Sequence, residues 1–172
     1  MKEIILLKDG ELALKGLNRS TFEDILIKNI RMRISSLGNF TYRKSQSTIV
    51  IEPENEDIDL DEAVSRICKV FGLVGVSRAA VCEKDIDKIL ETVWDYLGDE
   101  LMLSKTFKVN AKRADKKFPL TSPEICDEVG GFILSKVRGI KVDVHNPEYT
   151  VTVEVRDNAA YIRGPQLKGA GG

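Results

Sequence analysis

The sequence predicts an α+β fold built from two small domains. Each domain should contain its own small mixed sheet packed with helices. The first observation behind this prediction is the spacing of apolar residues, which is helical in some segments and strand-like in others. The second is size, because 172 residues with 42% apolar side chains suit one core or two small ones. The third is the order of the elements, which differs between the two halves of the chain.

The first half, residues 1–78, alternates strand and helix patterns. Strands are expected at 4–7, 40–43, 48–51 and 74–81, with helices at 22–37 and 60–71. The first helix should bury the stripe Phe22, Ile25, Leu26, Ile30, Ile34 and Leu37. Gly38 and Gly72 end the helices, and Asp59 caps the second one, with Glu62 three residues later. The order strand, helix, strand, strand, helix, strand predicts a ferredoxin-like domain.

The second half, residues 79–172, predicts a different arrangement. Its elements are a helix over 86–101, a strand over 107–112, a helix from Pro123 with Ser122 as its N-cap, and strands at 150–155 and 161–162. Lys108, Asn110 and Lys112 alternate with apolar residues, so the strand over 107–112 should have one wet, basic face. The last residues, 168–172, have the composition of a linker and are expected to pack against nothing.

Charge is unevenly distributed along the chain, although the net charge is only −1. Residues 52–62 hold seven acidic side chains and no basic one, whereas residues 104–141 hold nine basic side chains against four acidic ones. A polyanion would therefore be attracted to one part of the molecule and repelled by another.

The best candidate for a binding site lies within this basic stretch. Its cations follow the strand over 107–112 and its loop, where long side chains can reach phosphates, and an aromatic residue nearby offers a flat surface for an unpaired base. The candidate RNA-binding residues are Lys112, Arg113, Lys116, Lys117 and Phe118. The alternative is a solvated surface loop, and composition alone does not decide between the two.

Residues suited to catalysis are scarce. The one histidine, His145, lies in a turn, and the three cysteines, Cys68, Cys82 and Cys126, have wide and irregular spacing. We therefore expect reduced thiols, no metal site, no catalytic residue and a cytoplasmic protein, because the first residues also lack the pattern of a signal peptide and no stretch approaches the ~18 apolar residues of a membrane span.

Gly130 and Gly131 interrupt the helix that begins near Pro123. Each glycine in a helix costs about 1 kcal/mol relative to alanine, so another group should approach this backbone closely. The pair leaves two interpretations open, a strand packed against the helix or an RNA backbone lying on it.

Several long motifs follow one another in order along the whole chain. The first half holds residues 10–16 (GELALKG), Asn18-Arg19 and Phe22-Glu23. The second half holds residues 107–118 (FKVNAKRADKKF), 119–124 (PLTSPE), Gly130-Gly131, 142–147 (VDVHNP) and 156–161 (RDNAAY). Together they resemble one family, the tRNA 4-thiouridine synthetases, also called tRNA sulfurtransferases or ThiI, in which the first set is similar to the opening segment and the second to the THUMP domain.

The resemblance implies a ferredoxin-like domain followed by a THUMP domain that together hold tRNA, with THUMP taking the acceptor stem and the 3′ end. It also implies a PP-loop domain that uses ATP with Mg, sulfur supplied as a persulfide by a cysteine desulfurase, and a homodimeric parent. Some family members add a rhodanese domain and some serve thiamine synthesis. Lys15 and Arg19 are expected to contribute to RNA binding from the ferredoxin-like half.

The motif S-G-G-x-D-S of the PP-loop domain does not occur in the 172 residues, and the cysteines match none of the family's sulfur-carrying positions. We therefore expect a monomeric piece of the enzyme that is inactive alone and holds no cofactor. Three alternatives stay open: the RNA-binding THUMP module of another tRNA-modifying enzyme, a self-contained enzyme acting through Cys126 at a helix start, and a scaffold that binds protein.

Overall fold

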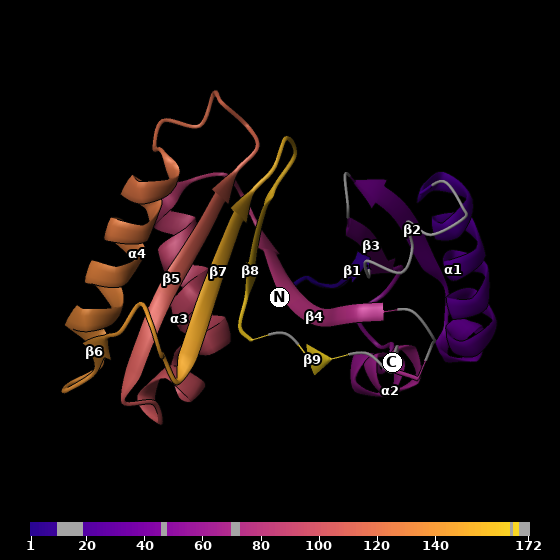
Figure 1. The fold of residues 1–172 in the computed structure, drawn as a ribbon, viewed down its shortest axis with the longest axis horizontal. Helices are drawn as coiled ribbons and strands as arrows, with labels where there is room; N and C mark the ends of the chain where they lie inside the picture. Colours follow the sequence, from indigo (N-terminus) through magenta and orange to yellow (C-terminus); the bar gives the residue numbers. More distant parts are fainter. Residues whose placement is uncertain (10–18, 46–47, 70–72, 166, 169–172) are drawn as a thin grey trace. The chain divides into compact units, whose positions relative to one another are not determined.

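The computed structural model describes residues 1–9, 19–45, 48–69, 73–165 and 167–168 (Figure 1). The chain divides into two compact units. The N-terminal unit comprises Glu3–Arg78 and Gln166–Gly172, and the C-terminal unit comprises Met1–Lys2 and Ala79–Pro165. No helix among the described residues is long and apolar enough to cross a membrane.

The strands form one hydrogen-bonded sheet, in the order β2-β3-β1-β4-β8-β7-β5-β6, with β9 pairing to β4. The α+β class is confirmed, but the prediction of two separate sheets is wrong. The reason is β4 (Leu73–Cys82), a strand of ten residues that belongs to both units. Ala80–Cys82 pair with β8 in one unit, whereas Gly75 and Val76 pair with β9 in the other.

The N-terminal unit has the predicted order of elements. They are β1 (Glu3–Asp9), α1 (Arg19–Ile34), the short 3-10 helix η2 (Ser35–Leu37), β2 (Phe40–Ser45), β3 (Thr48–Pro53), α2 (Leu60–Ile67) and the first part of β4. Strand β3 pairs antiparallel with both β1 and β2, so that Val50 lies opposite Leu6 and also opposite Arg43.

The core of the N-terminal unit is aliphatic and fully buried at Ile30, Ile34 and Ile67. Ile25 is 48% exposed, so its predicted place in the core is wrong, because the stripe of α1 is narrower than the sequence pattern. Asp59 caps α2 as predicted, accepting from the backbone N–H of Glu62 at 3.0 Å. Helix α2 ends at Ile67, before the predicted end; Phe71 and Gly72 lie outside the described residues.

Gly38 ends the helical segment at a position that requires glycine. Its φ is +146°, and a Cβ there would lie 2.7 Å from the side chain of Ile58. Both the backbone conformation and the packing therefore exclude a larger residue.

The C-terminal unit contains the last part of β4, then α3 (Ile86–Met102), β5 (Thr106–Arg113), α4 (Ser122–Lys136), β6 (Lys141–Val142), β7 (Tyr149–Val155) and β8 (Ala160–Arg163). Strand β5 is parallel to β6 and β7, and β7 is antiparallel to β8. Alternate residues of β7, Val151, Val153 and Val155, are fully buried and pack with both helices in one core.

Three further details of the chain differ from the prediction. The N-cap of α4 is Thr121 rather than Ser122, because the Thr121 side chain and Glu124 form a reciprocal capping box. The short strand β6 was not predicted, since two exposed residues carry no periodic signal. Lys168 pairs with Gly75 in β9 (Leu167–Lys168), so this residue does pack against the chain.

Candidate nucleic-acid interface

The candidate site is the basic loop, residues 112–118, which leaves the end of β5 and leads toward α4. The loop backbone is tied to the sheet where Ala114 N–H donates to the Val155 carbonyl at 2.8 Å. It then turns sharply, with Phe118 N–H donating to the Asp115 carbonyl at 3.2 Å. The basic loop is therefore an ordered turn attached to the rigid sheet, which suits a binding surface.

The lysines of the basic loop point into solvent. Lys112, Lys116 and Lys117 are exposed. Lys112 Nζ lies 3.9 Å from Glu154 Oε1 with 62% of its side chain exposed, so this pair leaves the ammonium accessible. Three cations are thus displayed together at the end of the strand, where an anionic ligand can reach them.

Arg113 plays a different part from the lysines. Its Nη1 donates to the carbonyl of Phe118 at 3.1 Å and to that of Leu120 at 3.4 Å. The guanidinium therefore closes the loop on itself. A direct contact of Arg113 with RNA stays a prediction, but the side chain has a structural role that the sequence did not indicate.

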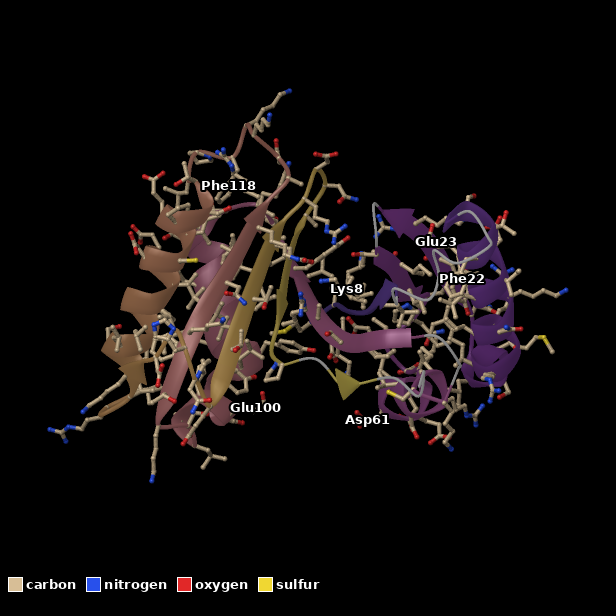
Figure 2. All side chains as sticks on the ribbon, viewed as in Figure 1. Lys8, Phe22, Glu23, Asp61, Glu100 and Phe118 are labelled. Carbon is tan, nitrogen blue, oxygen red and sulfur yellow. The ribbon has the colours of Figure 1, made fainter. Side chains whose placement is uncertain are left out.

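Phe118 does not offer the stacking surface that was expected. Its side chain is 5% exposed and packs into the core of the C-terminal unit (Figure 2). The turn that presents Lys116 and Lys117 folds the aromatic ring inward, because burial of such a ring is strongly favourable. The prediction of a base stacked on Phe118 is corrected: the ring anchors the loop.

The buried carboxylate of Glu154 organises a second group of cations next to the basic loop. Only 6% of Glu154 is exposed, although strand alternation places it on the face of β7 opposite the core residues. Arg156 Nη2 lies 3.3 Å from Oε2, and Arg163 Nη2 lies 3.8 Å from Oε1. Burial lowers the pKa of Arg163 below its ordinary value. The negative charge of Glu154 opposes this shift, and the positive charge of Arg156 adds to it.

This cluster was not predicted from the sequence. Its only sequence signal was a carboxylate between two valines, followed closely by Arg156 and later by Arg163. Arg156 follows Glu154 by two residues, whereas Arg163 of β8 reaches the same carboxylate only through the pairing of β7 with β8.

Gly130 and Gly131 lie in α4 with open space beside them. A Cβ added at either position would meet no atom within 4 Å. The interpretation that a strand packs against these glycines is therefore wrong. The second interpretation, an RNA backbone approaching this part of the helix, stays a prediction.

The thiols have the character of structural cysteines. Burial raises the pKa of Cys68, Cys82 and Cys126 above the ordinary value for a thiol. The Cys126 Sγ donates to the Val109 carbonyl at 3.3 Å, and Asp127 raises its pKa further. These thiols are mostly protonated at neutral pH, which argues against a nucleophilic role for Cys126.

Among the residues that the structure describes, no group of three His, Cys, Asp or Glu side chains is arranged to hold a metal ion. His145 is exposed, and its backbone N–H donates to Asp143 in a turn. Lys15 and the side chain of Arg19, the two candidates in the N-terminal half, lie outside the described residues. On α1 itself, the acidic residue Glu23 is buried, with 3% of its surface exposed (Figure 2).

Comparison with known proteins identifies the family to which the two halves of the chain are related. Residues 4–77 match the ThiI ferredoxin-like domain, and residues 83–163 match the THUMP domain. The first of these domains is defined by the ThiI proteins themselves. The chain belongs to the ThiI family. It carries two of the family's domains, in the order that the sequence motifs predicted.

Curated relatives of this ThiI-family chain agree with the assignment. A probable tRNA sulfurtransferase of Caldanaerobacter subterraneus subsp. tengcongensis is 41% identical over 172 residues, which is 100% of this chain and 44% of the relative. A probable tRNA sulfurtransferase of Acetivibrio thermocellus is 45% identical over 159 residues, covering 91% of this chain and 41% of the relative. The chain thus spans less than half the length of these relatives.

Solved structures share the fold. A 4-thiouridine synthetase crystallised with RNA and bound ATP superposes with a TM-score of 0.82 and 28% identity, over 100% of this chain and 43% of that one. A Pyrococcus horikoshii protein gives a TM-score of 0.85 at 29% identity, over 99% of this chain and 56% of that one. TrmN from Thermus thermophilus, at 20% identity and a TM-score of 0.63, shows a likeness of fold alone.

Proposed function

We propose that this chain is the tRNA-binding portion of a tRNA sulfurtransferase that makes 4-thiouridine in tRNA. The observation that carries the proposal is the display of Lys112, Lys116 and Lys117 on an ordered loop of a THUMP domain. Loop cations attached to a rigid sheet bind a phosphate backbone without reorganising the fold. The solved complex of a related 4-thiouridine synthetase with RNA supports RNA as the ligand.

The basic loop divides the work of binding among its residues. The exposed lysines contact phosphates of the tRNA acceptor stem and its 3′ end, whereas Arg113 and Phe118 hold the loop in shape. Lys15 and Arg19 add contacts from the ferredoxin-like half. No residue of this chain is proposed to be catalytic.

The activity of the whole protein is part of the same proposal. A PP-loop domain would activate a tRNA uridine with ATP and Mg, and a cysteine desulfurase would supply the sulfur as a persulfide. The whole protein would work in the cytoplasm as a homodimer. In organisms that use it so, it would also contribute sulfur to thiamine thiazole synthesis. The likeness to probable tRNA sulfurtransferases over the full 172 residues supports this assignment.

Titration of labelled tRNA with the 172-residue chain at two salt concentrations tests the proposal. Because phosphate contacts release counterions, affinity should fall steeply as salt rises. Absence of binding at low salt, or binding that salt does not weaken, would contradict it. Binding of an unrelated acidic protein with equal affinity would favour the protein-scaffold alternative.

A further inference from the structure

Lys84 lies between β4 and α3 and reaches the basic loop. Its Nζ lies 2.7 Å from Asp115 Oδ2 and also donates to the carbonyl of Asp157, in the turn between β7 and β8. One ammonium group therefore joins three segments of the C-terminal unit. The side chains of Lys84 and Asp115 are 28% and 14% exposed, so solvent screens this pair less than it screens a surface pair.

The second oxygen of Asp115 fixes the backbone inside the basic loop. Oδ1 accepts from the Lys117 N–H at 3.0 Å, and the Asp115 carbonyl accepts from the Phe118 N–H at 3.2 Å. The hydrogen bond from Lys84, followed by that from Lys117, lowers the pKa of Asp115 below its ordinary value. Asp115 is thus ionised at neutral pH, and it sets the turn from which Lys116 and Lys117 project.

An acidic side chain in this place is unexpected on charge alone. A carboxylate next to two exposed lysines lowers the positive potential that would attract a polyanion. Its contacts supply the reason for its presence. A loop that is ordered before its ligand arrives does not lose that conformational freedom on binding, so the affinity is higher.

We propose that Lys84 and Asp115 are positioning residues of the RNA interface, holding the turn beneath Lys116 and Lys117 without touching RNA themselves. This inference rests on the proposed function, since it assigns a role in binding tRNA. It goes further by separating the residues that shape the loop from those that contact phosphates.

Two substitutions that change the net charge in opposite directions test the proposal. Asp115→Asn removes one negative charge and with it the ion pair to Lys84, whereas Lys84→Met removes one positive charge and the same ion pair. We expect both to weaken tRNA binding roughly threefold to tenfold, because both leave the loop to be ordered on binding. Lys84→Arg, which keeps a cationic donor, should restore affinity to within about twofold of wild type.

The salt dependence supplies a second readout. In Asp115→Asn the slope of log affinity against log salt should stay unchanged, since no phosphate contact is removed. Asp127→Asn removes an exposed carboxylate of α4 and serves as the control, with affinity unchanged or higher. Faster hydrogen exchange of the Lys117 amide in Asp115→Ala should report the loosened turn directly.

The outcomes separate this inference from the proposed function. Tighter binding by Asp115→Asn with weaker binding by Lys84→Met would mean that binding follows charge alone, which overturns the positioning role and leaves tRNA binding intact. Failure of the wild-type chain to bind tRNA at low salt would overturn both. An unchanged Lys117 exchange rate in Asp115→Ala would also contradict the positioning role.

Discussion

The basic loop and the Glu154 cluster contain the same kinds of side chain but use them differently. In the basic loop, Lys116 and Lys117 are exposed and available to a ligand. In the Glu154 cluster, the Arg156 and Arg163 side chains are 17% and 11% exposed and lie against a buried carboxylate. The number of basic residues in a stretch of sequence therefore does not measure the positive charge that a surface offers.

The same difference appears within the basic loop itself. Arg113 donates to two carbonyls of the loop, and Phe118 is buried in the core, whereas the neighbouring lysines face solvent. Residues that look like one binding motif in the sequence thus divide into two sets, one shaping the loop and one facing solvent. Substitutions at Phe118, Glu154 and Gly131 test this division.

The largest expected effect concerns Phe118. Phe118→Ala should lower the free energy of unfolding by about 4 kcal/mol, because it leaves a cavity in the core of the C-terminal unit. Urea denaturation measures the change, with the partly exposed Phe132 as a control whose replacement by alanine should have a smaller effect. Wild-type stability combined with lost tRNA affinity would instead indicate an exposed, base-stacking ring.

The next effect concerns the buried carboxylate. Glu154→Gln should lower the free energy of unfolding by about 3 kcal/mol, because Arg156 and Arg163 would lose the buried charge that compensates them. The exposed Glu128 of α4 provides the control, since Glu128→Gln should change stability by less than about 0.5 kcal/mol. Equal effects of the two substitutions would remove the distinction between the two groups of cations.

A smaller effect of opposite sign is expected at Gly131. Gly131→Ala should raise the free energy of unfolding by up to about 1 kcal/mol, since alanine favours the helix and the added Cβ meets no atom within 4 Å. If an RNA backbone approaches this part of α4, the same variant should bind tRNA more weakly while being more stable. Unchanged tRNA affinity would exclude RNA contact at this glycine.

The sequence predicted the order of the elements well because local signals determine it. Helical spacing located α3, and Asp59 with Glu62 located the start of α2. The continuous sheet was missed because strand pairing is decided by contacts between distant segments, and no local pattern shows that the ten residues of β4 pair at both ends. The exposure of Ile25 shows the same limit, since an apolar residue next to a core stripe need not be buried.

Part of the geometry of the candidate site could be predicted from the sequence. Sequence composition indicated the basic loop, and the exposed positions of Lys112, Lys116 and Lys117 agree with an open surface there. The burial of Phe118 could not be read from the sequence, because it depends on which way a turn of a few residues faces. The roles of Lys84 and Asp115 were also invisible, since these residues are 31 positions apart and meet only in the folded chain.

In the function that we propose, exposed lysines of the basic loop bind tRNA through its phosphates. The most direct measurement compares the salt dependence of tRNA affinity for wild type, Lys116→Ala/Lys117→Ala and the matched control Lys105→Ala/Lys141→Ala, which removes the same charge at other exposed positions. The loop variant should bind more weakly, with a slope reduced by about 0.7 to 0.9 for each lost contact, and should unfold like wild type. Equal losses of affinity and slope in the two double variants would contradict this role of the loop, because tRNA would then respond to net charge alone.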